Sequence, residues 1–199
     1  MTGVLQFEAA SHTYTLDGQI LPSVTQVLED VGIIDYSFLP AEDRQKYLTR
    51  GSAAHLATQL DDEGDLDEDT VDPAIAPYLV AWRGFRSDSG FTPALIEHRG
   101  FSPEHGYAGT LDRSGTFSGK PTTMYILDIK TGTAPWWVRV QLAAYSAFFD
   151  GPRKYPRIAV ELHDDGTYRV SEEFPGRDWQ KDFSVFTSAL EVYRAKRRK

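Results

Sequence analysis

The chain has 199 residues and contains no cysteine. Disulfide bonds, zinc sites built on thiolates and iron–sulfur clusters are therefore excluded, because all of them need cysteine sulfur. No apolar run approaches the roughly 20 residues of a membrane-spanning helix, and the first residues, MTGVLQFEAASH, do not resemble a signal peptide. We therefore expect a soluble protein of the cytoplasm, or of the host cytoplasm if a phage encodes it, with no membrane partner.

Several common sequence signatures are also missing. The chain has no glycine-rich phosphate loop of either common pattern and no Gly-x-Ser-x-Gly nucleophile turn. Internal repeats, the mark of repeat architectures, are absent as well. What remains as a source of chemistry is a set of carboxylates and a lysine in the middle of the chain.

Acidic residues outnumber basic ones, and the formal net charge is −8. Such a charge argues at first against nucleic acid as a partner. The excess is local, however, because residues 61–72 (DDEGDLDEDTVD) hold eight acids and no base, and the rest of the chain is neutral overall. We predict a solvated acidic loop over residues 61–72. A neutral remainder can still carry a basic groove, so the charge does not exclude DNA.

The length suits one α/β domain over residues 1–199. Residues 1–30 predict an N-terminal β-hairpin followed by a helix. Asp17-Gly18, between two alternating runs, is a strong signal for a two-residue hairpin turn. Ser23 is a suitable N-cap for the helix that follows.

The rest of the chain alternates between helix and strand patterns. Together they predict a central mixed β-sheet of about four or five strands flanked by helices. Predicted helices cover residues 41–60, 74–87, 134–149 and 179–196, and predicted strands cover residues 94–98, 109–112, 124–130, 157–162 and 168–174.

Two aspartates and a lysine lie in an order that suits a divalent metal. Asp112 follows a run of small residues, and Asp128 and Lys130 end an apolar run. Because strand side chains alternate, Asp128 and Lys130 point to one face of the sheet while Ile129 points to the other. If the two runs pair as antiparallel strands, Asp112 comes alongside Asp128. Two carboxylates beside one ammonium make a site for a hard divalent cation and the phosphate oxygens that it binds.

Four short elements in order strengthen this interpretation: Arg50-Gly51-x-x-x-His55, Gly109-x-x-Asp112, Asp128-x-Lys130-Thr131-Gly132 and Gln141-x-x-x-Tyr145. With them the chain resembles the PD-(D/E)xK nuclease superfamily, specifically its RecB-like and Cas4-like branch, which includes phage recombination exonucleases. Phage relatives in this family begin with a similar hairpin and Ser-Val-Thr helix, so the resemblance extends over most of the chain.

The resemblance implies an α/β, restriction-endonuclease-like core with the site at one edge of the sheet. It implies a deoxyribonuclease that depends on Mg²⁺ or Mn²⁺. In it, Asp112 and Asp128 hold the metal, helped by the Ile129 carbonyl and His55. Lys130 orients the attacking water or stabilises charge on the transition state, and cleavage leaves a 5′-phosphate. Many relatives in this branch carry a four-cysteine iron–sulfur cluster, which this chain cannot have because it has no cysteine.

Other candidate residues keep two interpretations each. Gln141 and Tyr145 share one face of the predicted helix 134–149. They either pack in the core or, as the resemblance favours, face the cleft as catalytic residues that hold the DNA backbone or order the site. His55 is an ordinary helix histidine or, by the resemblance, a metal ligand. Glu97, which precedes the Gly-x-x-Asp strand, either supports the metal indirectly or pairs with an arginine.

The expected partner is DNA, at linear single- or double-stranded ends, and a single-strand-binding or annealing protein is a second candidate. Exonuclease action in phage-type recombination, replication or repair is the favoured function. The alternatives are a structure-specific endonuclease on the same fold and a non-catalytic DNA-binding module. The intact acid–lysine set disfavours the module, and the lack of an added recognition domain disfavours the endonuclease. Digestion polarity, strand preference and oligomeric state stay open.

Overall fold

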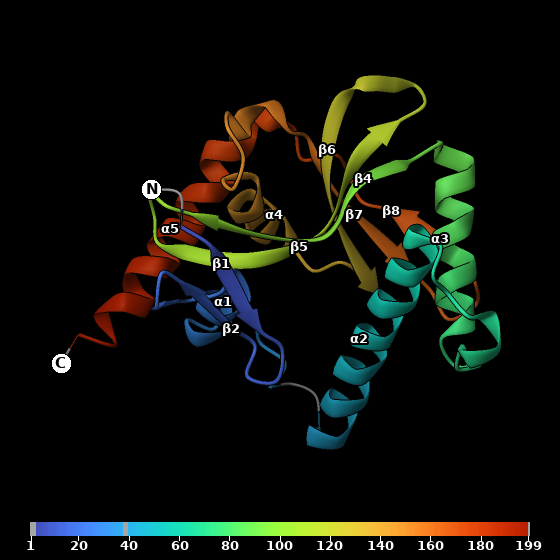
Figure 1. Ribbon diagram of the computed structural model, residues 1–199, viewed down its shortest axis with the longest axis horizontal. Helices are drawn as coiled ribbons and strands as arrows, with labels where there is room; N and C mark the ends of the chain where they lie inside the picture. The colour runs from blue at the N-terminus through green and yellow to red at the C-terminus, as the bar shows by residue number, and fades with distance from the viewer. Residues whose placement is uncertain (1–2, 38–39, 199) are drawn as a thin grey trace.

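The computed structural model describes residues 3–37 and 40–198. Eight strands form within these residues: β1 (Leu5–Glu8), β2 (Thr13–Leu16), β3 (Gln19–Leu21), β4 (Thr92–Ser102), β5 (Tyr107–Phe117), β6 (Lys120–Thr131), β7 (Arg157–Leu162) and β8 (Tyr168–Val170). Strands β4–β5–β6–β7–β8 make a five-stranded sheet in that order, and β1–β2–β3 make a separate three-stranded sheet (Figure 1). In the larger sheet only β6 and β7 pair in parallel, so the sheet is mixed, as predicted.

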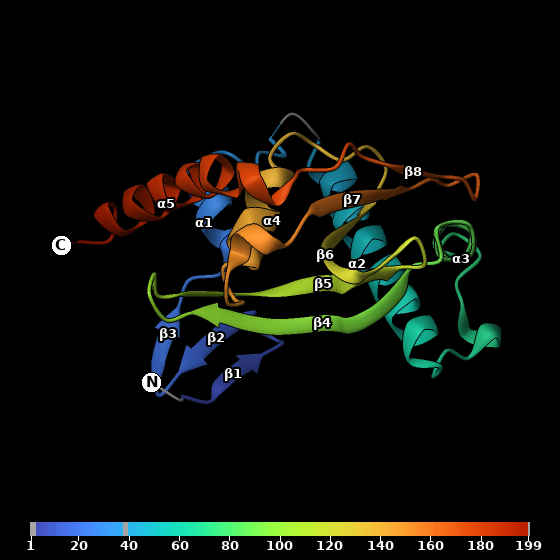
Figure 2. The same cartoon turned by 90° about the horizontal axis from the view of Figure 1, so that it is seen from above.

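Helices cover both faces of the five-stranded sheet, which confirms the predicted α/β class. The helices are α1 (Val24–Asp30), α2 (Ala41–Glu63), α3 (Ala76–Ser89), α4 (Val138–Ser146) and α5 (Trp179–Ala195). Helices α1, α4 and α5 pack on one face, and α2 and α3 pack on the other. Figure 2 shows β4 and β5 lying between the N-terminal sheet and the layer of α1, α4 and α5. No helix in the described ranges is both long enough and apolar enough to cross a bilayer.

Strand β6 shows how the sequence pattern sorts side chains between the two faces. Ile126 packs in the cluster with α1, α4 and α5, whereas Leu127 and Ile129 pack in the cluster with α2 and α3. Successive strand residues point to opposite faces, so Asp128 and Lys130 share the α4 face with Ile126. This confirms the predicted shared face of Asp128 and Lys130.

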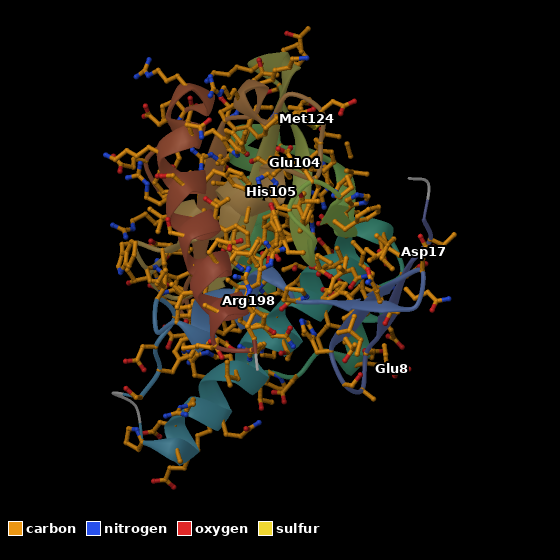
Figure 3. The ribbon with its side chains drawn as sticks, turned by 90° about the vertical axis from the view of Figure 1, so that its left-hand side faces the viewer. Glu8, Asp17, Glu104, His105, Met124 and Arg198 are labelled. Carbon is orange, nitrogen blue, oxygen red and sulfur yellow. The ribbon has the colours of Figure 1, made fainter. Side chains whose placement is uncertain are left out.

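The N-terminal residues form the predicted hairpin and one further strand. Strands β2 and β3 pair across the Asp17-Gly18 turn, where both residues have positive φ. The additional strand, β1, pairs with β2 from Leu5 opposite Leu16 to Glu8 opposite Thr13. Figure 3 places Glu8 and Asp17 on this separate sheet.

The C-terminal helix, α5, is attached to the turn end of the β4–β5 hairpin. The turn that joins β4 to β5 carries Glu104 and His105 and lies beside α5 (Figure 3). There the Arg194 guanidinium donates a hydrogen bond to the His105 carbonyl, and the His105 ring packs edge-on against Phe183 at 5.1 Å between ring centroids.

Several predicted boundaries need correction. The predicted helix 134–149 is shorter, because the Ala134 amide donates to Glu161 on β7 (2.9 Å) instead of starting a helix. The predicted strand 168–174 ends at Val170, and Phe174 returns only as an isolated bridge to Arg157. Strands β4, β5 and β6 are all longer than predicted, and only two residues separate β5 from β6.

The predicted acidic loop over residues 61–72 is wrong for its first three residues, which complete α2. The Asp62 side chain is fully buried. It accepts hydrogen bonds from Trp82 Nε1 (3.0 Å), Arg86 Nη1 (2.6 Å) and Arg113 Nε (2.6 Å). The acidity of this segment is therefore partly neutralised inside the fold, because cations from α3 and β5 reach it.

Helix α1 is fixed by a capping box at Ser23. Ser23 Oγ accepts from the Gln26 amide (3.1 Å), and the Ser23 amide donates to Gln26 Oε1 (3.0 Å). The same residue forms a bridge with Ala108 on β5, and the Ala108 amide donates to the Pro22 carbonyl (3.0 Å). The N-cap thus fixes both the start of α1 and its position against the sheet.

We expect Ser23→Ala to lower the free energy of unfolding by about 1 kcal/mol, because the first turn of α1 loses a hydrogen-bond acceptor. Urea denaturation measures this change. Ser188→Ala, at an exposed position on α5, is the control and should change stability by less than roughly 0.5 kcal/mol. Equal stabilities for the two variants would contradict the capping argument.

Candidate metal centre

Strands β5 and β6 pair over only part of their length. Their antiparallel ladder runs from Phe117 opposite Lys120 to Arg113 opposite Leu127. Before Arg113, β5 continues beside β4, and after Leu127, β6 continues beside β7. The two strands therefore diverge, and Asp112 and Asp128 are the first residues beyond the last pair. We call this divergence the fork (Figure 1).

The fork lies between the second and third strands of the five-stranded sheet. The expectation that the site lies at one edge of the sheet is therefore wrong. The physical reason is the parallel pairing of β7 with β6, from Ile126 opposite Arg157 onward, which places two more strands beyond β6. The predicted antiparallel pairing of the two carboxylate strands is confirmed.

Asp112 closes the fork with its side chain. Its Oδ2 accepts a hydrogen bond from the Ile129 amide at 2.7 Å, where a regular ladder would use a main-chain carbonyl. The carboxylate is almost fully buried, and its Oδ1 lies 3.7 Å from His55 Nδ1. One oxygen of Asp112 is thus used in holding the strands, and the other faces His55.

His55 reaches the fork from α2. Its Nε2 lies 3.1 Å from the Ile129 carbonyl, and its Nδ1 lies 3.7 Å from both Glu97 Oε1 and Asp112 Oδ1. Burial lowers the pKa of His55, but the Asp112 and Glu97 carboxylates outweigh it, and the net shift is upward. The structure therefore places His55 beside Asp112 and the Ile129 carbonyl, two groups with which it was predicted to share a metal.

Glu97 joins this group, although sequence reasoning did not place it among the metal-holding residues. Ligand atoms of His55, Glu97 and Asp112 all lie within 4.8 Å of one another. Of the two interpretations left open for Glu97, the pairing with an arginine is confirmed, since its Oε1 accepts a hydrogen bond from Arg113 Nη1 at 2.9 Å. The signal in the sequence was its place before the Gly-x-x-Asp strand.

The backbone at Glu97 is unusual. Its φ of +44° lies in the left-handed region, within an otherwise extended strand. A non-glycine residue held there costs roughly 1–3 kcal/mol, and such residues gather at functional sites. Its neighbours Ile96 and His98 pair regularly with Arg113 and Leu111, so Glu97 stands opposite Asp112.

Asp128 and Lys130 form the other side of the fork. Lys130 Nζ lies 2.6 Å from Asp128 Oδ2, and Asp128 is only 1% exposed. Burial, with a further contribution from Asp112, raises the pKa of Asp128 to about 6, although Lys130 opposes the shift. Asp128 Oδ1 is buried and receives no hydrogen bond from any described residue. Asp128 is not part of the cluster of His55, Glu97 and Asp112, and its Oδ2 pairs with Lys130.

Helix α4 supplies the last two candidate residues. Gln141 Nε2 donates to the Tyr145 hydroxyl at 3.1 Å, and burial strongly raises the pKa of Tyr145. Gln141 Oε1 is buried and has no hydrogen-bond partner within the described ranges. Gly109 explains the first position of Gly-x-x-Asp, because a Cβ there would lie 2.8 Å from the Tyr145 ring.

These side chains line one cleft of about 480 Å³. His12 and Tyr14 of the N-terminal sheet form part of one wall, and the Tyr14 hydroxyl is hydrogen-bonded to Thr110 on β5 at 2.7 Å. Leu48 and Leu56 of α2, 43% and 54% exposed, line the opposite side. All of the predicted site residues line this cleft: His55, Asp112, Asp128, Ile129, Lys130, Gln141 and Tyr145.

Two comparisons with known proteins identify no relative of this chain. A scan against protein-family models finds no match, and a search of curated proteins finds no significant match either. The resemblance to the PD-(D/E)xK nucleases therefore stays a prediction that rests on the sequence motifs.

The raised pKa of Asp128 gives a pH-dependent prediction. Its pKa is 3.8 ordinarily and about 6 in the folded protein, so the folded state binds more protons than the unfolded chain between these values. Stability contributed by this group therefore falls as pH rises from about 4 to about 6. Relative to Asp128→Asn, the wild-type free energy of unfolding should fall by up to about 3 kcal/mol over this range.

Urea denaturation in EDTA at several pH values between 4 and 7 measures this difference. EDTA keeps divalent metal away from the carboxylates, so that protons are the only ligand that varies. Stability curves of the wild type and Asp128→Asn that run parallel over this range would contradict the assigned burial of the charge.

Proposed function

We propose that the chain is a metal-dependent deoxyribonuclease that hydrolyses phosphodiester bonds, with exonuclease action favoured. One observation carries the proposal: an imidazole and two carboxylates converge within 4.8 Å at the fork, next to an aspartate–lysine pair. The residues that form this arrangement are His55, Glu97, Asp112, Asp128 and Lys130.

The donor set fits Mg²⁺ or Mn²⁺. Carboxylate and carbonyl oxygens, which suit these hard cations, make up the donor set apart from one imidazole nitrogen. His55, Glu97 and Asp112 would hold the ion, together with the Ile129 carbonyl. Asp128 Oδ1, buried and without a partner among the described residues, is the orphaned atom expected of a ligand. An ion between the two sides of the fork would satisfy it.

Electrostatics also call for a cation. Glu97, Asp112 and Asp128 line the cleft, and Lys130 is the one lysine or arginine among the cleft-lining residues that the structure describes. Such a site repels a phosphodiester in the absence of metal. A bound divalent cation supplies Lewis-acid polarisation of a phosphoryl oxygen and lowers the pKa of a bound water.

The chain's own residues divide the remaining tasks. Lys130 lines the cleft, with its ammonium beside the Asp128 carboxylate. There it can orient the attacking water or stabilise negative charge that develops on the phosphoryl oxygens. Gln141 and Tyr145 present a carbonyl oxygen and a hydroxyl at the back of the cleft, where they can order the water or the DNA backbone.

The shape of the cleft favours a strand end over an intact duplex. It is closed on one side by the N-terminal sheet and on the other by α2, and it holds about 480 Å³. Tyr36 and Tyr47 are among its lining residues, with ring centroids 5.7 Å apart. Aromatic rings at this position can stack on bases of a single strand without regard to sequence.

The acidic net charge is less adverse to DNA than the composition alone indicates. Asp61 and Asp62 pair with Arg83, Arg86 and Arg113 on the α2–α3 side of the sheet. These carboxylates are committed to internal pairs, so they present less negative charge to an incoming strand.

We expect Lys130→Ala to lower the rate of DNA cleavage by roughly 10²-fold or more while Mn²⁺ binding persists. The ammonium acts on the reaction, whereas the metal is held by carboxylates and His55. Asp128→Ala should lose both cleavage and metal binding. Cleavage of end-labelled DNA and isothermal titration with Mn²⁺ measure the two properties separately.

Lys120→Ala is the matched control, because Lys120 lies at the other end of the same strand and is bonded to Tyr125 and Glu173. It should cleave DNA at the wild-type rate. Undiminished cleavage by Lys130→Ala would refute the assigned role of Lys130.

A further inference from the structure

Arg113 is a fully buried arginine immediately after Asp112 on β5. All three of its guanidinium nitrogens donate hydrogen bonds. Nε donates to Asp62 (2.6 Å), Nη2 to Thr58 (3.3 Å), and Nη1 to both the Asp112 carbonyl (2.7 Å) and Glu97 Oε1 (2.9 Å). The guanidinium therefore connects α2 to Glu97 and Asp112, two of the three residues of the candidate metal site.

Asp62 holds the guanidinium in place. Its Oδ2 accepts from Arg113, and its Oδ1 accepts from Trp82 and Arg86 on α3. The Arg113 guanidinium also lies over the Trp82 ring, 5.5 Å from its centroid. Its orientation is thus fixed from several sides and does not depend on Glu97.

A buried ion pair of this kind is a weak source of stability. Removing two charges from water costs nearly as much as their attraction returns, and apolar side chains of similar volume often serve as well. The stability of the fold therefore gives little reason for Arg113 and Asp62. A reason appears at the fork, where Arg113 is the only described residue that donates a hydrogen bond to the Glu97 side chain.

Glu97 needs such a partner. Its side chain is 22% exposed at the cleft and lies 3.7 Å from His55 Nδ1. The charge-assisted hydrogen bond from Arg113 Nη1, a group that is itself held in place, restrains the position of the Glu97 carboxylate. Because the hydrogen bond ends on Oε1, Oε2 stays free of hydrogen bonds from the described residues.

We propose that Arg113, held by Asp62, is a positioning residue that fixes the Glu97 carboxylate for metal binding. The inference rests on the proposed function, since it assigns the metal to the cluster of His55, Glu97 and Asp112. It gives a function to Asp62, which the sequence places in an acidic run. Partners that orient metal ligands in this way change metal affinity by about 10–100-fold when they are removed.

A double-mutant cycle on Mn²⁺ affinity tests the proposal, with isothermal titration of the DNA-free protein as the measurement. Arg113→Lys keeps the positive charge but loses the planar guanidinium group. It should weaken Mn²⁺ binding about 10–100-fold. Glu97→Gln should weaken binding by itself, and the double variant should bind no more weakly than Glu97→Gln, because the lysine acts through an absent carboxylate.

Arg157→Lys is the matched control. Arg157 is equally buried, and it pairs with Asp182 at 2.9 Å on the other side of the molecule from α2. It should lose stability without losing Mn²⁺ affinity. If Arg113→Lys fails to fold, Asp62→Asn serves in its place, because it keeps Arg113 but weakens the ion pair that holds the guanidinium. Its loss of affinity should again vanish in the Glu97→Gln background.

The outcomes separate this inference from the proposed function. Unchanged Mn²⁺ affinity in Arg113→Lys, or a loss that adds fully to that of Glu97→Gln, would overturn the positioning role and leave the nuclease proposal standing. If the two variants lose Mn²⁺ affinity in a coupled way but the wild-type protein cleaves no DNA, the positioning role is supported and the nuclease proposal is refuted. A wild-type protein that binds no Mn²⁺ would overturn both.

Discussion

One hydrogen bond, from the Ile129 amide to Asp112 Oδ2, joins β5 to β6 just beyond their last ladder pair. The strands separate there because β5 continues with β4 while β6 continues with β7. The opening admits side chains from both faces of the sheet, His55 from α2 and Tyr145 from α4. A fully paired sheet would separate the side chains of α2 from those of α4. The cleft depends on the fork, and the fork is closed by a carboxylate that also belongs to the candidate metal-binding cluster of His55, Glu97 and Asp112.

Features that do not favour folding gather around this opening. Asp128 is buried with a raised pKa, Glu97 has a positive φ, and Gln141 Oε1 lacks a partner among the described residues. Two hydrophobic clusters, one on each face of the sheet, surround the opening and supply the stability that offsets these features. Such a concentration of strain and buried charge at one place is expected of a site that gains its favourable contacts only with a ligand.

Local signals in the sequence predicted the local structure. The Asp17-Gly18 turn, the Ser23 cap and the shared face of Asp128 and Lys130 each depend on a few neighbouring residues. The features that the sequence did not predict depend on contacts between residues far apart in the chain. The burial of Asp62 depends on Arg113, 51 residues away, and the place of Glu97 depends on its partner strand. The position of the fork within the sheet depends on the pairing of β7 with β6. The motifs on β5 and β6 do not indicate that pairing.

Digestion of end-labelled DNA by the wild-type protein tests the central claim most directly. Linear single-stranded DNA, linear duplex and a closed circle are each incubated with Mg²⁺, Mn²⁺ or EDTA. The account predicts metal-dependent loss of linear DNA from its ends, with the circle intact and no loss in EDTA. Nicking of the circle would replace exonuclease by endonuclease action. Failure to cleave any substrate with either metal, by protein that binds Mn²⁺, would contradict the claim that this fork hydrolyses DNA.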